Sequence, residues 1–115
     1  MIDQALACLA QTIFMEARGE NHQGQVAVGY VLMRRAEFKP ERICLEMARP
    51  SQFSWYGKQK PPQKSELKPY YLVAWRVMYK LEPDYSKGST HFHNFTVNPR
   101  WNMKPRVTIQ NHIFY

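Results

Sequence analysis

The chain has 115 residues, a length that fits one domain and allows a hydrophobic core without metal or disulfide support. Its 16 Lys and Arg against 9 Asp and Glu give a net charge of +7, which favours a polyanionic partner such as nucleic acid, an anionic membrane or an acidic cell-wall polymer. The basic residues are scattered, so we expect no nucleic-acid partner, and no apolar run reaches the length of a membrane span.

An amphipathic helix is predicted from about Asp3 to Ala17, with Asp3 as its N-cap and Gly19 as the residue that ends it. At about 100° per residue, Glu16 continues the apolar stripe of this helix. The other members of the stripe are Ile2, Leu6, Leu9 and Ile13. The N-terminus has no basic segment before an apolar run, so we expect synthesis in the cytoplasm without a signal peptide.

A second helix is predicted from about His22 to Ala36. Asn21 can cap it, and the segment VAVGYVL is apolar nearly all round, which is typical of a central, buried helix. Gly29 would let a neighbouring helix approach closely. Glu20 lies near the positive N-terminal end of this helix, where a carboxylate is favourable, so we expect Glu20 to support the helix.

Two further helices flank an aromatic loop. Pro40 leads into a short helix, ERICLEMA, which Pro50 ends, and the following SQFSWYGKQKPPQKSE is typical of a loop. A helix is predicted from about Leu67 to Leu81, with Pro69 tolerated in its first turn. One face of this helix has the spacing of a buried surface. The residues on that face are Tyr71, Ala74, Trp75 and Met78.

The C-terminal segments THFHNF and RVTIQNHIFY alternate like short strands, and VNPRWNMKP between them is rich in turn residues. We see no internal repeat. The predicted fold class is therefore α+β, with one domain over residues 1–115 that consists of a helical body and a small C-terminal β-element.

Glu16 is the best candidate for a proton donor. Burial on an apolar stripe disfavours the charged form of a carboxyl group and raises its pKa, which a general acid working near neutral pH requires. The alternative is a glutamate at a helix end that turns out to solvent. Glycoside hydrolysis usually needs a second carboxylate, and only Glu20 lies close in sequence. A mechanism with a single carboxylate therefore fits the sequence better.

Aromatic and amide side chains suit sugar binding, because aromatic faces pack on pyranose rings while amides and hydroxyls meet the sugar hydroxyl groups. The aromatic loop and the C-terminal segments supply such side chains, although core packing is the alternative for each aromatic residue. These candidates are Gln52, Ser54, Trp55, Tyr56, Asn94, Asn98 and Trp101.

Three histidines raise the question of a metal. His91 and His93 alternate along a predicted strand and so share a face, and His112 could join them. No cysteine or carboxylate nearby completes a ligand set. We therefore expect hydrogen-bonding histidines, with no metal and no cofactor.

Cys8 and Cys44 are the only cysteines. Two thiols so far apart do not make a disulfide framework. We expect both to be reduced and partly buried.

The segment TIFMEARGENHQGQVAVGYVLMRR resembles the opening of the SleB-type cell-wall hydrolases, a group that includes spore-cortex-lytic enzymes and some phage endolysins. PSQFSW is similar to the family's loop after the third helix, and STHFHNFTVNPRW and IQNHIFY are similar to its C-terminal strands. The resemblance extends from about Leu9 to Tyr115. Several motifs in the right order make it more specific than EARGE alone.

The resemblance implies a lysozyme-like, transglycosylase-type α+β fold and cleavage of the β-1,4 bond between N-acetylmuramic acid and N-acetylglucosamine. It implies that Glu16, the first glutamate of EARGE, is catalytic, and that the reaction is a lytic transglycosylation with a 1,6-anhydro product. The side chains expected to bind the peptidoglycan strand are Gln52, Ser54, Trp55, His91, His93, Asn94, Trp101, His112 and Tyr115.

A compact basic chain without a leader or a separate binding domain is similar to a phage endolysin. We expect a monomer that reaches the cell wall after holin-dependent release, helped by attraction to an anionic envelope. Two alternatives stay open. One is a hydrolytic muramidase of the same fold that uses Glu20 or a water-positioning side chain. The other is a non-catalytic module that binds cell wall or nucleic acid.

Overall fold

The computed structural model describes residues 2–50 and 52–115. The helices in this part are α1 (Ile2–Ala17), α2 (His22–Arg35), α3 (Pro40–Met47) and α4 (Lys64–Met78). The strands are β1 (Phe92–Asn94), β2 (Val107–Ile109) and β3 (His112–Phe114). The α+β class and the C-terminal position of the strands are as predicted.

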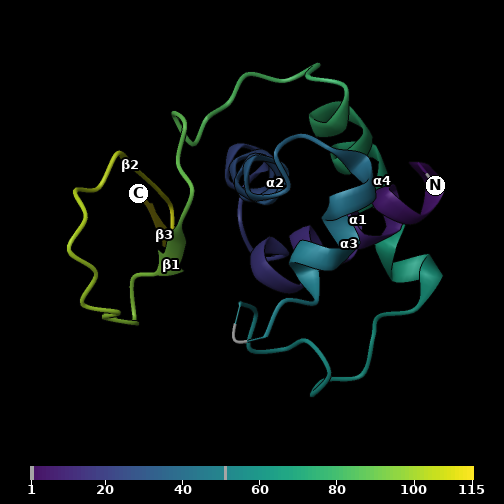
Figure 1. The fold of residues 1–115 in the computed structure, drawn as a ribbon, viewed down its shortest axis with the longest axis horizontal. Helices are drawn as coiled ribbons and strands as arrows, with labels where there is room; N and C mark the ends of the chain where they lie inside the picture. The colour runs from purple at the N-terminus through teal and green to yellow at the C-terminus, as the bar shows by residue number, and fades with distance from the viewer. Residues whose placement is uncertain (1, 51) are drawn as a thin grey trace.

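The central helix is α2, which lies between the sheet and the other helices (Figure 1). On one side it packs with α1 and α4, and Gly29 allows the close approach that the sequence predicted. A Cβ at Gly29 would lie 3.2 Å from both Ile13 Cδ1 and Val77 Cγ2. Within residues 2–50 and 52–115, none of the helices is long and apolar enough to cross a membrane.

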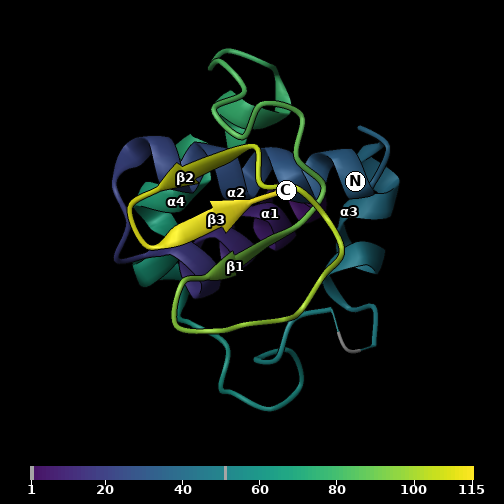
Figure 2. The ribbon, with the colours of Figure 1, turned by 90° about the vertical axis from the view of Figure 1, so that its left-hand side faces the viewer.

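The opposite side of α2 carries the sheet (Figure 2). The strand order is β1-β3-β2, and both pairs are antiparallel. Phe92 pairs with Phe114, and Asn94 pairs with His112. Phe114 and Ile109 pack on Ala17 and on the apolar face of α2, so the sheet is attached to the helical body through its buried side chains.

Two N-terminal caps were predicted, and one is confirmed. The Oδ1 atom of Asn21 accepts a hydrogen bond from the Gly24 N–H at 2.8 Å, which satisfies a free donor at the start of α2. Helix α1 instead begins at Ile2, so Asp3 lies in its first turn and is not the cap. Asp3 still places a negative charge near the positive end of the helix.

The prediction for α4 was wrong at both ends. The helix begins at Lys64, where the Glu66 carboxylate accepts from the Gln63 N–H at 3.4 Å, so Pro69 lies in the second turn and not in the first. It ends at Met78, because Lys80 adopts a φ of 56° that breaks the helix. Trp75, predicted to be buried, is 44% exposed and is not among the α4 residues that pack in the core.

The expectation of two reduced cysteines was also wrong. Cys8 on α1 and Cys44 on α3 form a disulfide, with their Cα atoms 5.4 Å apart. Spacing of 36 residues could not predict this pairing, because the packing of α1 against α3 brings the two Cα atoms within disulfide range.

Candidate active site

A groove of about 550 Å³ runs between the helical body and the sheet. Four segments that are far apart in the sequence line it: the end of α1, the loop after α3, the region of β1, and β3. Its lining residues are Met15, Glu16, Gln52, Phe53, Ser54, Lys58, Phe92, His93, Asn94, Val97 and His112.

Glu16 lies in the last turn of α1 with its carboxyl group half-buried at the groove. The indole Nε1–H of Trp55 donates a hydrogen bond to Glu16 Oε2 at 2.7 Å. Burial raises the pKa of Glu16, while the Trp55 hydrogen bond and the charge of Arg35 act in the opposite direction. The structure therefore gives Glu16 the raised pKa that the apolar stripe predicted.

Trp55 does not offer an exposed face to a sugar. Its side chain is only 4% exposed, and its ring stacks on Phe53 with 5.6 Å between the ring centroids. The sequence had suggested Trp55 as a groove residue, but it lies behind the carboxyl group that it holds. The loop folds inward at this position because the indole buries a large apolar surface and still finds an acceptor for its N–H.

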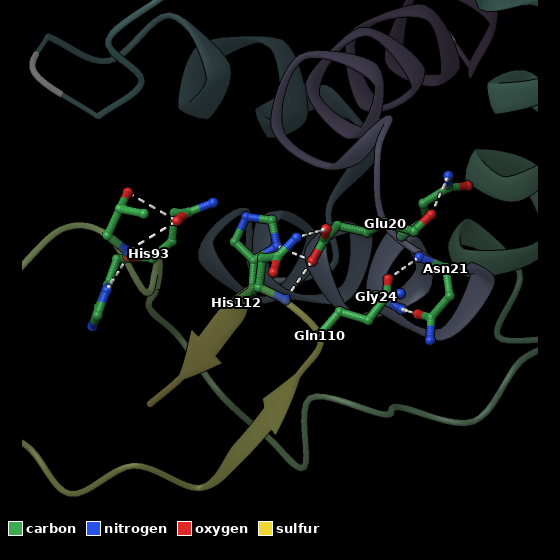
Figure 3. Close-up of polar contacts among 10 residues, drawn as sticks. Glu20, Asn21, Gly24, His93, Gln110 and His112 are labelled. Carbon is green, nitrogen blue, oxygen red and sulfur yellow. Dashed lines mark hydrogen bonds and ion pairs between the residues drawn. The ribbon is translucent and has the colours of Figure 1, made fainter.

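Glu20 attaches the sheet to the start of α2 and is not among the residues that line the groove (Figure 3). Its side chain is 5% exposed. Its carboxylate accepts hydrogen bonds from the N–H and Nδ2 of Asn111, each at 3.0 Å, and lies 3.1 Å from Nδ1 of His112. The sequence predicted that Glu20 supports the N-terminus of α2; in the structure its carboxylate instead holds the β2–β3 turn and His112.

His112 lines the groove beside Glu20 (Figure 3). Burial lowers the pKa of His112, and the neighbouring Glu20 carboxylate opposes that shift. A neutral imidazole whose Nδ1–H faces Glu20 leaves Nε2 as an acceptor. His112 is therefore a side chain that can accept a hydrogen bond from a hydroxyl group or a water.

Four of the predicted residues form an aromatic cluster next to the groove. His93 Nε2 and the Tyr115 hydroxyl are 2.8 Å apart, and the two rings stack. Trp101 places its ring edge-on to His91, His93 and Tyr115 at 5.2 to 5.4 Å. Trp101 is 37% exposed, so part of its surface is open to a ligand. Within this cluster, His93 lines the groove itself.

The remaining predicted residues line the groove, and His91 of the aromatic cluster also lines a second pocket. Gln52, Ser54 and Asn94 line the groove as expected. His91 lines a neighbouring pocket that also contains Gln52. In the described part of the chain no three His, Cys, Asp or Glu side chains are grouped so as to hold a metal ion.

Sequence reasoning missed several residues around Glu16. Arg35 acts on the charge of Glu16, and Phe92 and Val97 are apolar parts of the groove wall. The alternation of THFHNF places Phe92 on the strand face opposite the two histidines, so the sequence did not indicate that it lines the same groove as His93. No sequence signal indicated Arg35, because its position at the end of α2 does not predict which residues lie next to it in the folded protein.

The family model of the cell wall hydrolases matches residues 19–115. The chain belongs to this family. The matched segment begins three residues after Glu16 and includes the loop, the strands and Glu20. Comparisons with curated proteins and with solved structures give no match. Membership supports a peptidoglycan-degrading role for this cell wall hydrolase.

Proposed function

We propose that this cell wall hydrolase cleaves the β-1,4 bond between N-acetylmuramic acid and N-acetylglucosamine, with Glu16 as its single catalytic carboxyl group. One observation carries the proposal: Glu16 lies at the groove, partly buried, with a raised pKa and one oxygen held by Trp55. Because the match to the family begins after Glu16, its assignment depends on this geometry and on the EARGE resemblance.

The chemistry begins with protonated Glu16 donating its proton to the glycosidic oxygen, while the bond from that oxygen to C1 of muramic acid breaks. The N–H of Trp55 then stabilises the carboxylate that forms on Glu16. In the second half, this carboxylate removes the proton from the muramic C6 hydroxyl as its oxygen attacks C1. The product is a 1,6-anhydro sugar, and Glu16 is protonated again.

A lytic transglycosylase needs no second carboxylate, and this fits the groove. Among the described residues that line it, Glu16 is the only acidic one. Glu20 is occupied by Asn111 and His112, which favours a supporting role over a catalytic one.

Hydrolysis is the second candidate, because His112 faces the groove with Glu20 behind it. A neutral imidazole in that position could hold a water for attack at C1 in place of the C6 hydroxyl. The two reactions share the first step and differ in the group that attacks.

The test is digestion of purified peptidoglycan, followed by loss of turbidity and by mass analysis of the products. We expect Glu16→Gln to be folded and to lose activity by at least about 100-fold, as for a removed general acid. Glu41→Gln changes an exposed glutamate in the first turn of α3 and serves as the matched control. Anhydro-muropeptides would support transglycosylation, and reducing muramic ends would support hydrolysis. Full activity in Glu16→Gln would exclude Glu16 as the catalytic carboxyl group, and no released product from the wild type would leave only a binding module.

We further propose that the protein is a monomeric phage endolysin that reaches the wall through a holin. The basic surface supports this proposal, because an anionic envelope attracts it. Expression in a bacterial host with and without a holin tests it. We expect lysis to require both proteins, and lysis by the chain alone would contradict the holin step.

A further inference from the structure

A second pocket of about 300 Å³ lies next to the groove, and we call it the arginine pocket. It lies at the end of α2, along α3, and near the start of β1. Its lining residues are Arg35, Glu37, Arg42, Glu46, Arg49, Gln52, Thr90 and His91.

The arginine pocket has an unbalanced positive charge. Arg42 pairs with Glu37 at 2.9 Å, and Arg49 pairs with the buried Glu46 at 3.0 Å. Three arginines against two glutamates leave one positive charge. This charge belongs to Arg35, which has no ion pair in the part of the chain that the structure describes. Arg35 is held by a hydrogen bond from Nε to the Thr90 carbonyl at 2.7 Å.

Arg35 stands within electrostatic reach of both the groove and the pocket. Its charge acts on the pKa of Glu16, which lines the groove, and on that of His91, which lines the pocket. In each case burial is the larger cause of the shift. Burial also lowers the pKa of Arg35 itself, as expected for a cation that has lost part of its water. An anionic ligand would replace that lost hydration.

The groove and the arginine pocket share Gln52 as a common wall. Gln52 Nε2 donates to the carbonyl and to Oε2 of Glu46, at 2.9 and 3.1 Å, so this wall is held in place. A ligand that fills the groove and carries a negatively charged branch could therefore extend past Gln52 to the arginines.

We propose that the arginine pocket binds a carboxylate of the stem peptide that muramic acid carries. This inference depends on the proposed function, because it assumes that a glycan strand lies in the groove. Muramic acid differs from other hexosamines by a lactyl group on C3, to which a short peptide with free carboxylates is attached. Arginine is the side chain best suited to a carboxylate, because its planar guanidinium group can donate two parallel hydrogen bonds.

Binding can be measured without cleavage. The probe is N-acetylmuramoyl-L-alanyl-D-glutamate, compared with its diamide, in calorimetric titrations of Glu16→Gln. We expect the dicarboxylate to bind about 5- to 20-fold more tightly than the diamide, a preference that weakens with added salt. In the Glu16→Gln background, Arg42→Gln and Arg49→Gln should each reduce the preference at least about threefold. Lys68→Gln removes an equal charge from the exposed side of α4 and should preserve it. Equal affinity for both probes would overturn the inference.

A second experiment measures cleavage. With Glu16 intact, kcat/KM is measured on whole peptidoglycan and on glycan strands whose stem peptides an amidase has removed. We expect the ratio of the two values to fall about 5- to 20-fold in the Arg42→Gln, Arg49→Gln double variant, and to stay at the wild-type value in Lys68→Gln. An unchanged ratio in the double variant would overturn the inference while the proposed function stands. A binding preference without any cleavage would instead overturn the proposed function alone. Urea unfolding of each variant shows that the comparison concerns folded protein.

Discussion

At the residue scale, the proposed chemistry depends on how one carboxyl group is surrounded. Glu16 combines burial, which favours its protonated form, with one N–H donor from Trp55, which favours its charged form. A residue that must donate a proton and then take one back needs both influences. If burial acted alone, Glu16 would stay protonated and would be a poor base in the second step.

Trp55→Phe should move the pH profile of the enzyme. The substitution keeps an aromatic ring and removes the hydrogen bond that lowers the pKa of Glu16, so that pKa should rise. In the proposed mechanism, activity requires protonated Glu16 and falls as pH rises through its pKa, so the alkaline limb of kcat/KM should shift to higher pH. The maximal rate should fall about 10-fold or more, because the carboxylate of the second step loses its donor. Tyr56→Phe, on the exposed neighbour, is the control and should leave the limb in place.

Glu16 should also make the stability of the protein depend on pH. Its pKa is raised by folding, so the native state binds more protons than the unfolded state between the two pKa values. The free energy of unfolding should therefore decrease as pH rises above the ordinary value of 4.5 and through the raised pKa. Glu16→Gln removes this pH-dependent contribution to the free energy of unfolding. Urea unfolding should show the variant gaining stability relative to the wild type between pH 4 and pH 7, and a constant difference would contradict a raised pKa.

At the scale of elements, the sheet is positioned by its contacts with the helices. The Glu20 carboxylate accepts hydrogen bonds from the N–H and Nδ2 of Asn111 and also contacts Nδ1 of His112 (Figure 3). The N–H of Asn21 donates to the side chain of Gln110. Together with the apolar contacts of Phe114, these bonds fix the position of β3 on α2. The groove wall formed by β1 and β3 therefore depends in part on residues outside the groove lining, namely Glu20, Asn111 and Phe114.

Glu20→Gln should lower the free energy of unfolding by about 1 to 3 kcal/mol, because a buried carboxylate that accepts from three donors is replaced by an amide that cannot accept from all of them. Urea unfolding measures this, with the exposed Glu41→Gln expected within about 0.5 kcal/mol of the wild type. Loss of activity without loss of stability would contradict the supporting role and favour a catalytic one.

At the scale of the whole molecule, the disulfide between Cys8 and Cys44 joins α1, which carries Glu16, to α3, which carries Glu46 and precedes the loop of Trp55. It therefore links elements on which both the groove and the arginine pocket depend. Disulfides persist in oxidising environments outside the cytoplasm, and this agrees with a cell-wall substrate.

Replacing both cysteines with serine should reduce the free energy of unfolding by about 2 to 4 kcal/mol, because the 36-residue separation closes a long loop in the unfolded chain. Urea unfolding of the wild type with and without dithiothreitol should reproduce the same difference. If the reductant has no effect on the midpoint, the disulfide does not form in the protein in solution.

The sequence by itself determined the periodic features of this protein. The 3.6-residue pattern predicted α1 and α2, the alternation of THFHNF and RVTIQNHIFY predicted the strands, and the apolar stripe singled out Glu16. These features are local, since the helix and strand periods depend on neighbouring residues only. The same is true of the Asn21 cap, whose donor is three residues away.

Only the tertiary structure decided the contacts between distant residues. The Trp55 bond to Glu16 spans 39 positions, the His112 contact with Glu20 spans 92, and the Cys8–Cys44 bond spans 36. No sequence period relates such positions, because helix packing and sheet placement set their distances. Thus the sequence indicated which residue could carry a proton, whereas the fold determined which distant side chain holds that residue.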